Sequence, residues 1–196
     1  MRKVDFARKT SETDIKGSLN LDGKGLYDIE TGCGFFNHMM ELFAKHGGFD
    51  VTLRCDGDLR VDGHHTVEDC GITLGKAFKD ALGDKKGINR YGSFIMPMDE
   101  ALILVAVDFS GRSYVGFDVK FPDEYKLGDM DTELIHEFML AFARSAELTP
   151  HVRKICGENN HHVAEGVFKG LARALRQAVA VDEKNGDVLP STKGVL

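Results

Sequence analysis

Apolar residues recur along the chain with two different periods. Segments rich in β-branched and aromatic residues, such as "ALILVAVDFSG" and "SYVGFDVKF", favour strands. Segments such as "HHTVEDCGITLGKAFKDAL" place apolar residues three and four positions apart, which predicts amphipathic helices. We expect strands near residues 3–9, 13–20, 25–30, 49–55, 90–96, 101–109, 113–120 and 151–156, and helices near residues 34–46, 64–82, 130–146 and 161–180.

The second half of the chain repeats the pattern of the first. "HHTVEDCGITLGKAFKDAL" aligns with "HHVAEGVFKGLARALRQAV", so that His64 corresponds to His161 and Glu68 to Glu165. The apolar positions that follow in both segments share one helical face. Two copies of His-His-x-x-Glu, each followed by the same helical pattern, indicate an internal duplication.

The order of expected elements is βββαβα in each half, which predicts an α+β fold. One sheet and two helices bury too little apolar surface to be stable alone. We therefore expect the helices of both halves to pack between two mostly four-stranded sheets. No segment rich in Pro, Gly or Ser separates the halves. The prediction is a single pseudo-symmetric domain over residues 1–196, with half-repeats of about 1–87 and 88–196.

Each His-His pair also has a third histidine upstream. His38 precedes His64 by 26 residues, and His136 precedes His161 by 25. Helical residues four apart lie on one face, so the first histidine of each pair and its glutamate can hold one ion. The second histidine projects about 100° around the helix and can reach a different ion. The expected metal ligands are His38, His64, His65, Glu68, His136, His161, His162 and Glu165.

These ligands suffice for two ions per chain. Nitrogen and oxygen donors without thiolates suit Mn, Fe, Co, Ni or Zn, and we expect Mn²⁺. The ligand set by itself leaves open a dinuclear metallohydrolase that acts on a phosphate ester. It also leaves open a metal-organised shell that resembles a storage protein.

Composition narrows the choice of partners. A hydrophobic content of 42% and a charged content of 29% are typical of a globular protein. The net charge of −6 disfavours nucleic-acid binding, although a local basic pocket for a small anion is compatible with it. The sequence has no signal-peptide pattern, so we do not expect export. It also has no apolar run of about 20 residues, so we expect no membrane partner. The cysteines form no CxxC motif, so we expect free thiols and a cytoplasmic protein.

Several motifs together carry a family resemblance. "FFNHMMELFAKHGGFD", "DGHHTVEDCGI", "PMDEAL", "DFSGRSY", "NNHHVAEGVFKGLARAL" and "LPSTKG" span nearly the whole chain. The chain thereby resembles imidazoleglycerol-phosphate dehydratase, a lyase of histidine biosynthesis, in the form without a fused phosphatase domain. The resemblance implies dehydration of D-erythro-imidazole glycerol phosphate to imidazole acetol phosphate. It also implies two Mn²⁺ ions that bind the imidazole ring and stabilise an imidazolate-type intermediate.

The resemblance further implies how the ligands divide between the ions. One ion would be held by His64, Glu68, His136 and His162. The other would be held by His38, His65, His161 and Glu165. Family members place these sites between neighbouring subunits, which implies a homo-oligomer that forms trimers and then a 24-mer when metal is bound.

Substrate-binding residues follow from the same motifs. Glu12 of "TSET" looks like the acid that contacts the substrate and transfers a proton, and His46 looks like the family's site-lining histidine. Asp99 and Glu100 of "PMDEAL" are expected to support the strand junction or the wall of the site. The residues that match the family's phosphate-binding positions are Arg90, Arg112, Lys169, Ser191 and Lys193.

Three positions depart from the repeat or from the family. Asp69 has no counterpart in the second copy, so we expect it to orient a ligating histidine or to favour the first helical turn. Asn37 stands where the family commonly has aspartate, and Ser113 where it commonly has proline. If that aspartate orients His38, the amide of Asn37 can still accept a hydrogen bond, but without charge.

Overall fold

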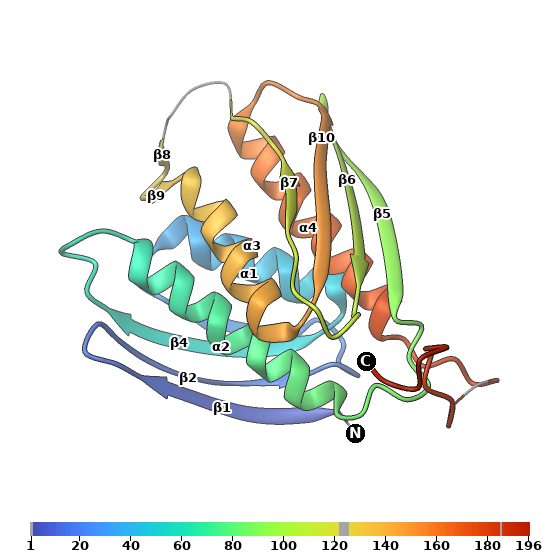
Figure 1. Cartoon of the computed structure of the whole chain (residues 1–196). Coiled ribbons are helices and arrows are strands. Elements are labelled where there is room, and N and C mark those ends of the chain that lie inside the picture. The colour runs from blue at the N-terminus through green and yellow to red at the C-terminus, as the bar shows by residue number, and fades with distance from the viewer. Residues whose placement is uncertain (1, 122–125, 185) are drawn as a thin grey trace.

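Two four-stranded sheets flank four helices in the computed structural model, which describes residues 2–121, 126–184 and 186–196 (Figure 1). The strand order is β1-β2-β4-β3 in the first sheet and β5-β6-β10-β7 in the second. Each sheet contains one parallel pair. The short strand β3 pairs with β4 in the first sheet, and the equivalent strand β7 pairs with β10 in the second. The α+β duplicated fold expected from the sequence is therefore confirmed.

The elements keep the βββαβα order in both halves. The first half comprises β1 (Lys3–Lys9), β2 (Thr13–Asn20), β3 (Tyr27–Glu30), α1 (Gly34–Gly47), β4 (Asp50–Gly57) and α2 (His64–Leu82). The second comprises β5 (Tyr91–Met98), β6 (Ala101–Asp108), β7 (Gly116–Asp118), α3 (Glu133–Ala146), β10 (Thr149–Cys156) and α4 (Asn160–Val179). The half-repeat boundaries themselves stay a prediction.

A short hairpin, which the sequence pattern did not predict, precedes α3. Strands β8 (Lys126–Leu127) and β9 (Met130–Asp131) pair in antiparallel fashion, so that α3 begins at Glu133 and not near residue 130. The carboxylate of Asp129 in this hairpin accepts hydrogen bonds from the backbone N–H groups of Gly34 (2.6 Å) and Phe35 (2.9 Å). The hairpin thus caps the N-terminus of α1, on which His38 lies one turn later.

Glycines set how closely the inner helices pack. α2 packs against α3 and the first sheet, whereas α4 packs against α1 and the second sheet. A Cβ atom on Gly75 of α2 would lie 2.4 Å from the carbonyl oxygen of Phe142 in α3. A Cβ atom on Gly170 of α4 would lie 2.8 Å from a methyl group of Val105 in β6. The glycines of α2 therefore allow close packing against a helix, and those of α4 allow close packing against a sheet.

The outer faces of the two sheets differ in chemistry. Along β2 and β4 the outward side chains are charged or hydroxylic, namely Asp14, Lys16, Ser18, Thr52, Arg54 and Asp56. Along β5, β6 and β10 many are apolar, namely Ile95, Pro97, Leu102, Leu104, Ala106 and Ile155. Ile95 lies directly opposite Leu104 in the strand register. No helix within the described ranges has the length and hydropathy required to cross a bilayer.

Candidate functional site

Three expected ligands meet where α1 crosses α4. The Nε2 atom of His38 lies 2.8 Å from Oε1 of Glu165, and Nε2 of His161 lies 3.1 Å from the same oxygen. One ligand atom from each of the three side chains lies within 4.8 Å of the others. A divalent ion bonded to such ligands at about 2.1 Å needs donors at this separation. Two imidazoles and a carboxylate therefore fit a borderline divalent metal.

Glu165 is held as an anion before any ion binds. Its side chain is 9% exposed, and Lys169 pairs with its second oxygen. Burial alone would raise the pKa of this carboxyl. Hydrogen bonds from Lys169 and from the two imidazole rings outweigh burial and lower the pKa to about 2. The carboxylate is therefore charged and already oriented toward His38 and His161.

The counterparts of these three residues in the repeat, His136, His64 and Glu68, are further apart among the described residues. His64 Nε2 lies 3.9 Å from Glu68 Oε2, and both side chains are more than one-third exposed. His136 stacks on Phe117, with the ring centroids 4.7 Å apart and the ring planes at 15°. Among the described residues, His136 forms no ligand cluster with His64 or Glu68. A single chain thus assembles one ligand group and leaves the members of the other separate.

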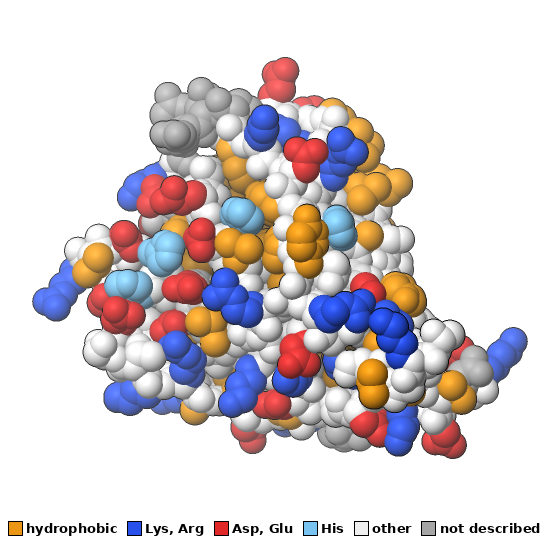
Figure 2. All heavy atoms as spheres, in the orientation of Figure 1, with side chains coloured by type: hydrophobic (Ala, Val, Ile, Leu, Met, Phe, Trp, Pro, Cys, Tyr) orange, Lys and Arg blue, Asp and Glu red, His pale blue; other side chains and the backbone are white. Residues whose placement is uncertain are grey.

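The second histidine of each pair is bound by an acidic residue from a loop. His65 Nδ1 lies 3.0 Å from Asp58, and His162 Nδ1 lies 2.6 Å from Glu100. The hydrogen bond to the carboxylate is the largest cause of the raised pKa of each ring. Neither ring joins the cluster around Glu165 in the described part of the chain. Figure 2 shows histidine side chains beside acidic ones on the face where α2 begins.

Glu12, expected to transfer a proton, and His46, expected to line the site, lie at the edges of these groups. Glu12, in the turn between β1 and β2, places Oε1 at 3.7 Å from Nε2 of His65. His46, in the last turn of α1, is half-buried. Its pKa is lowered first by burial and then by the positive charges of Lys169 and Arg173. His46 is therefore a neutral imidazole beside the cationic side of α4.

Three of the five expected phosphate-binding residues lie close together, and the other two lie on different elements. Arg90 and Ser191 line a pocket of about 400 Å³ together with residues 189–192. Arg90 is held there by Asp108 (2.7 Å) and by the carbonyl oxygen of Pro190 (2.8 Å). The backbone N–H of Lys193 donates to the Ser191 hydroxyl (3.2 Å), so Lys193 belongs to the same segment.

The other two expected residues lie on different elements. Lys169 pairs with Glu165 in the middle of α4. Arg112 is exposed on the connection between β6 and β7. Among the described residues, no hydrogen bond or ion pair joins either of them to the pocket of Arg90.

The expectation for Asp69 is corrected, and the structure gives Asn37 a partner other than His38. Asp69 is buried, and it accepts hydrogen bonds from the Thr13 hydroxyl (2.5 Å) and from Arg8. It therefore fastens α2 to β1 and β2, and it neither orients a ligand nor acts on the first turn. Asn37 accepts from the backbone N–H (2.9 Å) and hydroxyl (2.6 Å) of Thr31, which closes the loop before α1. Its side-chain oxygen is thus used by that loop and not by His38.

Two acids matter more than the sequence indicated. Glu100, between β5 and β6, accepts from the backbone N–H of Asn159 (2.9 Å) at the start of α4, and it also contacts His162. No motif in the sequence points to Asp58. Its only local signal is that it lies in the loop seven residues before His65.

Comparisons with known proteins agree with one another. The family model for imidazoleglycerol-phosphate dehydratase matches residues 31–175. An imidazoleglycerol-phosphate dehydratase of Cereibacter sphaeroides (strain ATCC 17029) is 56% identical and covers 100% of both chains. One from Clostridium botulinum (strain Hall) is 59% identical over 96% of this chain and 95% of the relative.

Solved structures give the same result. The Staphylococcus aureus enzyme superposes with a TM-score of 0.82 at 38% identity, covering 91% of this chain and 100% of that one. The Pyrococcus furiosus enzyme, crystallised in complex with (S)-C348, gives a TM-score of 0.83 at 39% identity, covering 97% and 99% of the two chains.

Proposed function

We propose, because the chain belongs to the imidazoleglycerol-phosphate dehydratase family of hydro-lyases, that it dehydrates D-erythro-imidazole glycerol phosphate to imidazole acetol phosphate in histidine biosynthesis. The observation that carries this proposal is the cluster of His38, His161 and Glu165. Its donors suit a divalent ion, for which we propose Mn²⁺, with two ions per subunit. When bound, such ions would supply Lewis acidity to the imidazole ring of the substrate.

The chain's own residues provide the proton transfers. Dehydration removes a proton from carbon and expels a hydroxyl group, which leaves as water. Glu12 is an exposed carboxylate beside His65, and we assign to it a proton transfer at the substrate. His46 is the second group to which we assign a proton transfer. The pKa of its ring is lowered, so the imidazole is neutral and can accept a proton.

The cationic residues bind the phosphate group. Arg90 presents a guanidinium that is oriented by Asp108, and the segment 189–192 forms the facing wall of the pocket. A guanidinium with hydroxyl and ammonium partners is a suitable donor set for a phosphate. Proposed phosphate ligands are Arg90, Arg112, Lys169, Ser191 and Lys193.

The enzyme acts as a homo-oligomer. Within the described residues, three of the eight proposed ligands form a cluster, and we propose that a neighbouring subunit completes the sites of the others. The apolar outer face of the second sheet, around Ile95 and Leu104, is a suitable surface for another copy of the chain. We propose trimers that assemble with metal into a 24-mer in the cytoplasm, with the ligands divided between the ions as the family resemblance implies.

A single incubation tests the function. Mn²⁺-loaded protein is mixed with imidazole glycerol phosphate, and the products are followed by NMR and by a phosphate assay. We expect a keto product without inorganic phosphate. Release of phosphate would instead support the metallohydrolase and overturn the dehydratase.

Two further measurements complete the test. Glu12→Gln should bind the substrate but dehydrate it at least about 100-fold more slowly. Metal analysis should return about two ions per chain, since the repeat offers ligands for two. A content far above two would favour the storage shell.

A further inference from the structure

His65 and His162 are presented in the same way, although they lie in different halves of the chain. A loop carboxylate contacts the Nδ1 atom of each ring, at 3.0 Å from Asp58 and at 2.6 Å from Glu100. The opposite nitrogen, Nε2, lies near a second acid, which is Glu12 (3.7 Å) for His65 and Asp99 (3.6 Å) for His162. The two rings therefore share one orientation relative to their own carboxylates.

This contact determines which nitrogen of a neutral ring carries the proton. An ionised carboxylate accepts hydrogen bonds and donates none. Nδ1 must therefore carry the hydrogen in the contacts of His65 with Asp58 and of His162 with Glu100. The lone pair is then left on Nε2, the nitrogen on the opposite side of each ring from the carboxylate that contacts Nδ1. A carboxylate behind a histidine is the arrangement that orients ligating histidines in metal sites.

We infer that Asp58 and Glu100 are positioning residues that hold His65 and His162 in the Nδ1–H tautomer, so that each ring offers Nε2 to a divalent ion shared with a neighbouring subunit. The inference rests on the proposed function, because it assigns the two rings to the proposed metal ions. It adds two residues to the site, each acting through a histidine.

The carboxylates of Asp58 and Glu100 differ in the other hydrogen bonds that they accept. Glu100 also accepts from the backbone N–H groups of Glu158 (3.3 Å) and Asn159 (2.9 Å), directly before α4 begins. The side chain of Asn159 in turn accepts from the backbone N–H of His161 (2.9 Å). Glu100 thus fixes the start of the helix as well as the ring. Among the described residues, the carboxylate of Asp58 receives a hydrogen bond from His65 alone.

Amide variants test the effect of the carboxylate on the ring while the size and shape of the side chain stay the same. Glu100→Gln and Asp58→Asn keep the size of the side chain but allow its NH₂ group to donate to Nδ1. In Glu100→Gln the amide oxygen keeps the backbone N–H groups of Glu158 and Asn159, so the NH₂ group faces Nδ1 and the ring becomes the Nε2–H tautomer, whose Nε2 cannot bind metal. The amide of Asp58→Asn has no such partner among the described residues, so this variant removes the charge that orients His65 without fixing the tautomer. We expect the Mn²⁺ affinity of one ion to fall about 10–100-fold in each single variant, and of both ions in the double variant.

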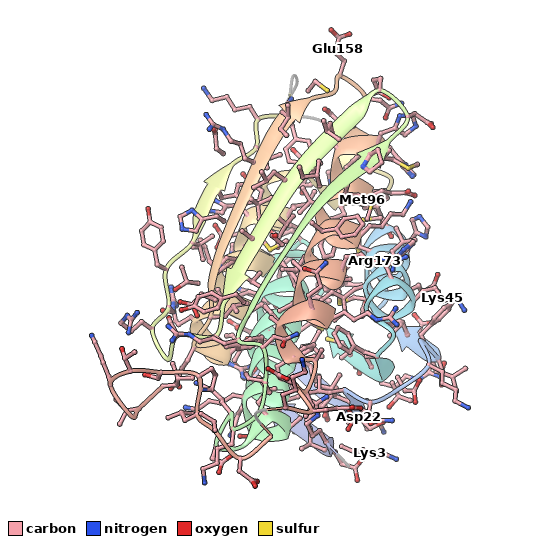
Figure 3. The ribbon with its side chains drawn as sticks, turned by 90° about the vertical axis from the view of Figure 1, so that its right-hand side faces the viewer. Lys3, Asp22, Lys45, Met96, Glu158 and Arg173 are labelled. Atoms are coloured by element: carbon pink, nitrogen blue, oxygen red, sulfur yellow. The ribbon has the colours of Figure 1, made fainter. Side chains whose placement is uncertain are left out.

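Matched controls make the same chemical change nearby. Glu158→Gln lies two residues before α4, where the side chain projects into solvent at the far end of the molecule (Figure 3). Asp56→Asn lies on the outer face of β4, two residues before Asp58. Both controls should bind two ions with unchanged affinity.

The tautomers are read by ¹⁵N-detected imidazole NMR on metal-free protein at about pH 9, where neutral rings dominate. We expect the Nδ1–H form of His65 and His162 in the parent protein, and the Nε2–H form of His162 in Glu100→Gln. An Nε2–H form in the parent protein would overturn the inference, and so would unchanged affinity in a variant with an inverted tautomer. Failure of the proposed function would appear separately, as a parent protein that neither binds Mn²⁺ nor dehydrates the substrate.

Discussion

Glu68 and Glu165 occupy the same position of the duplicated motif, but their surroundings are opposite. Glu165 is 9% exposed and bonded by Lys169, His38 and His161, whereas the side chain of Glu68 is 37% exposed and lies 3.9 Å from His64. Four residues after each glutamate stands Lys169 in one copy and Ile72 in the other. The duplication therefore preserved the ligand types and changed the environment of one copy. Among the described residues, one group of proposed ligands is held together within the chain, and its counterparts lie apart.

The largest expected effect is a loss of stability on substitution of one of the two glutamates but not of the other. In metal-free protein, Glu165→Gln leaves the nearly buried ammonium of Lys169 without a carboxylate and should lower the free energy of unfolding by about 3 kcal/mol. Glu68→Gln should change it by less than about 0.5 kcal/mol, because that side chain is exposed. Urea denaturation of both variants measures the difference. Equal losses would show that the two environments are equivalent.

A second prediction compares the two sheets. Leu104→Lys places a charge on the apolar outer face of the second sheet, and it should weaken self-association about 100-fold. Ser18→Lys, on the charged outer face of the first sheet, should leave assembly unchanged. Light scattering across a dilution series reports both. Loss of assembly in Ser18→Lys alone would move the proposed interface to the first sheet.

A third prediction concerns the two inner helices. Gly75→Ala pushes a methyl group against the backbone carbonyl of Phe142 and should cost about 2 kcal/mol of stability. Among the described residues, the tightest contact of Gly170→Ala is with a methyl group of Val105 (2.8 Å), and the gain in helix propensity offsets part of its cost. We therefore expect a change within about 1 kcal/mol for Gly170→Ala. Thermal unfolding of the two variants tests whether the helix–helix contact is the tighter one.

The smallest expected effect is a dependence of stability on pH. The pKa of Glu165 is lowered from 4.5 to about 2 in the folded chain, so its contribution is complete above the unfolded value and declines as the pH falls toward 2. Metal-free parent protein should lose about 1 kcal/mol at this site between neutral pH and pH 4. Glu165→Gln should lack this component, which acid titration of unfolding in both proteins would reveal. Identical acid profiles would contradict the lowered pKa.

Some missed features share one physical cause. Asp129 caps α1 from 95 residues away in the chain, and Asp69 fastens α2 to Thr13 from 56 residues away. A carboxylate carries no local mark of the distant group that it will meet. The hairpin of β8 and β9 has only two residues in each strand, which is too short to give an alternating pattern.

The sequence by itself determined the duplicated order of helices and strands, because hydrophobic periodicity is a local property that survives in each copy. It also marked the histidines and glutamates as a repeated set. Only the tertiary structure decided that His38 meets Glu165 across 127 residues while His136 stacks on Phe117. The physical reason is that ligand geometry depends on how α1 crosses α4, and packing between distant segments sets that crossing.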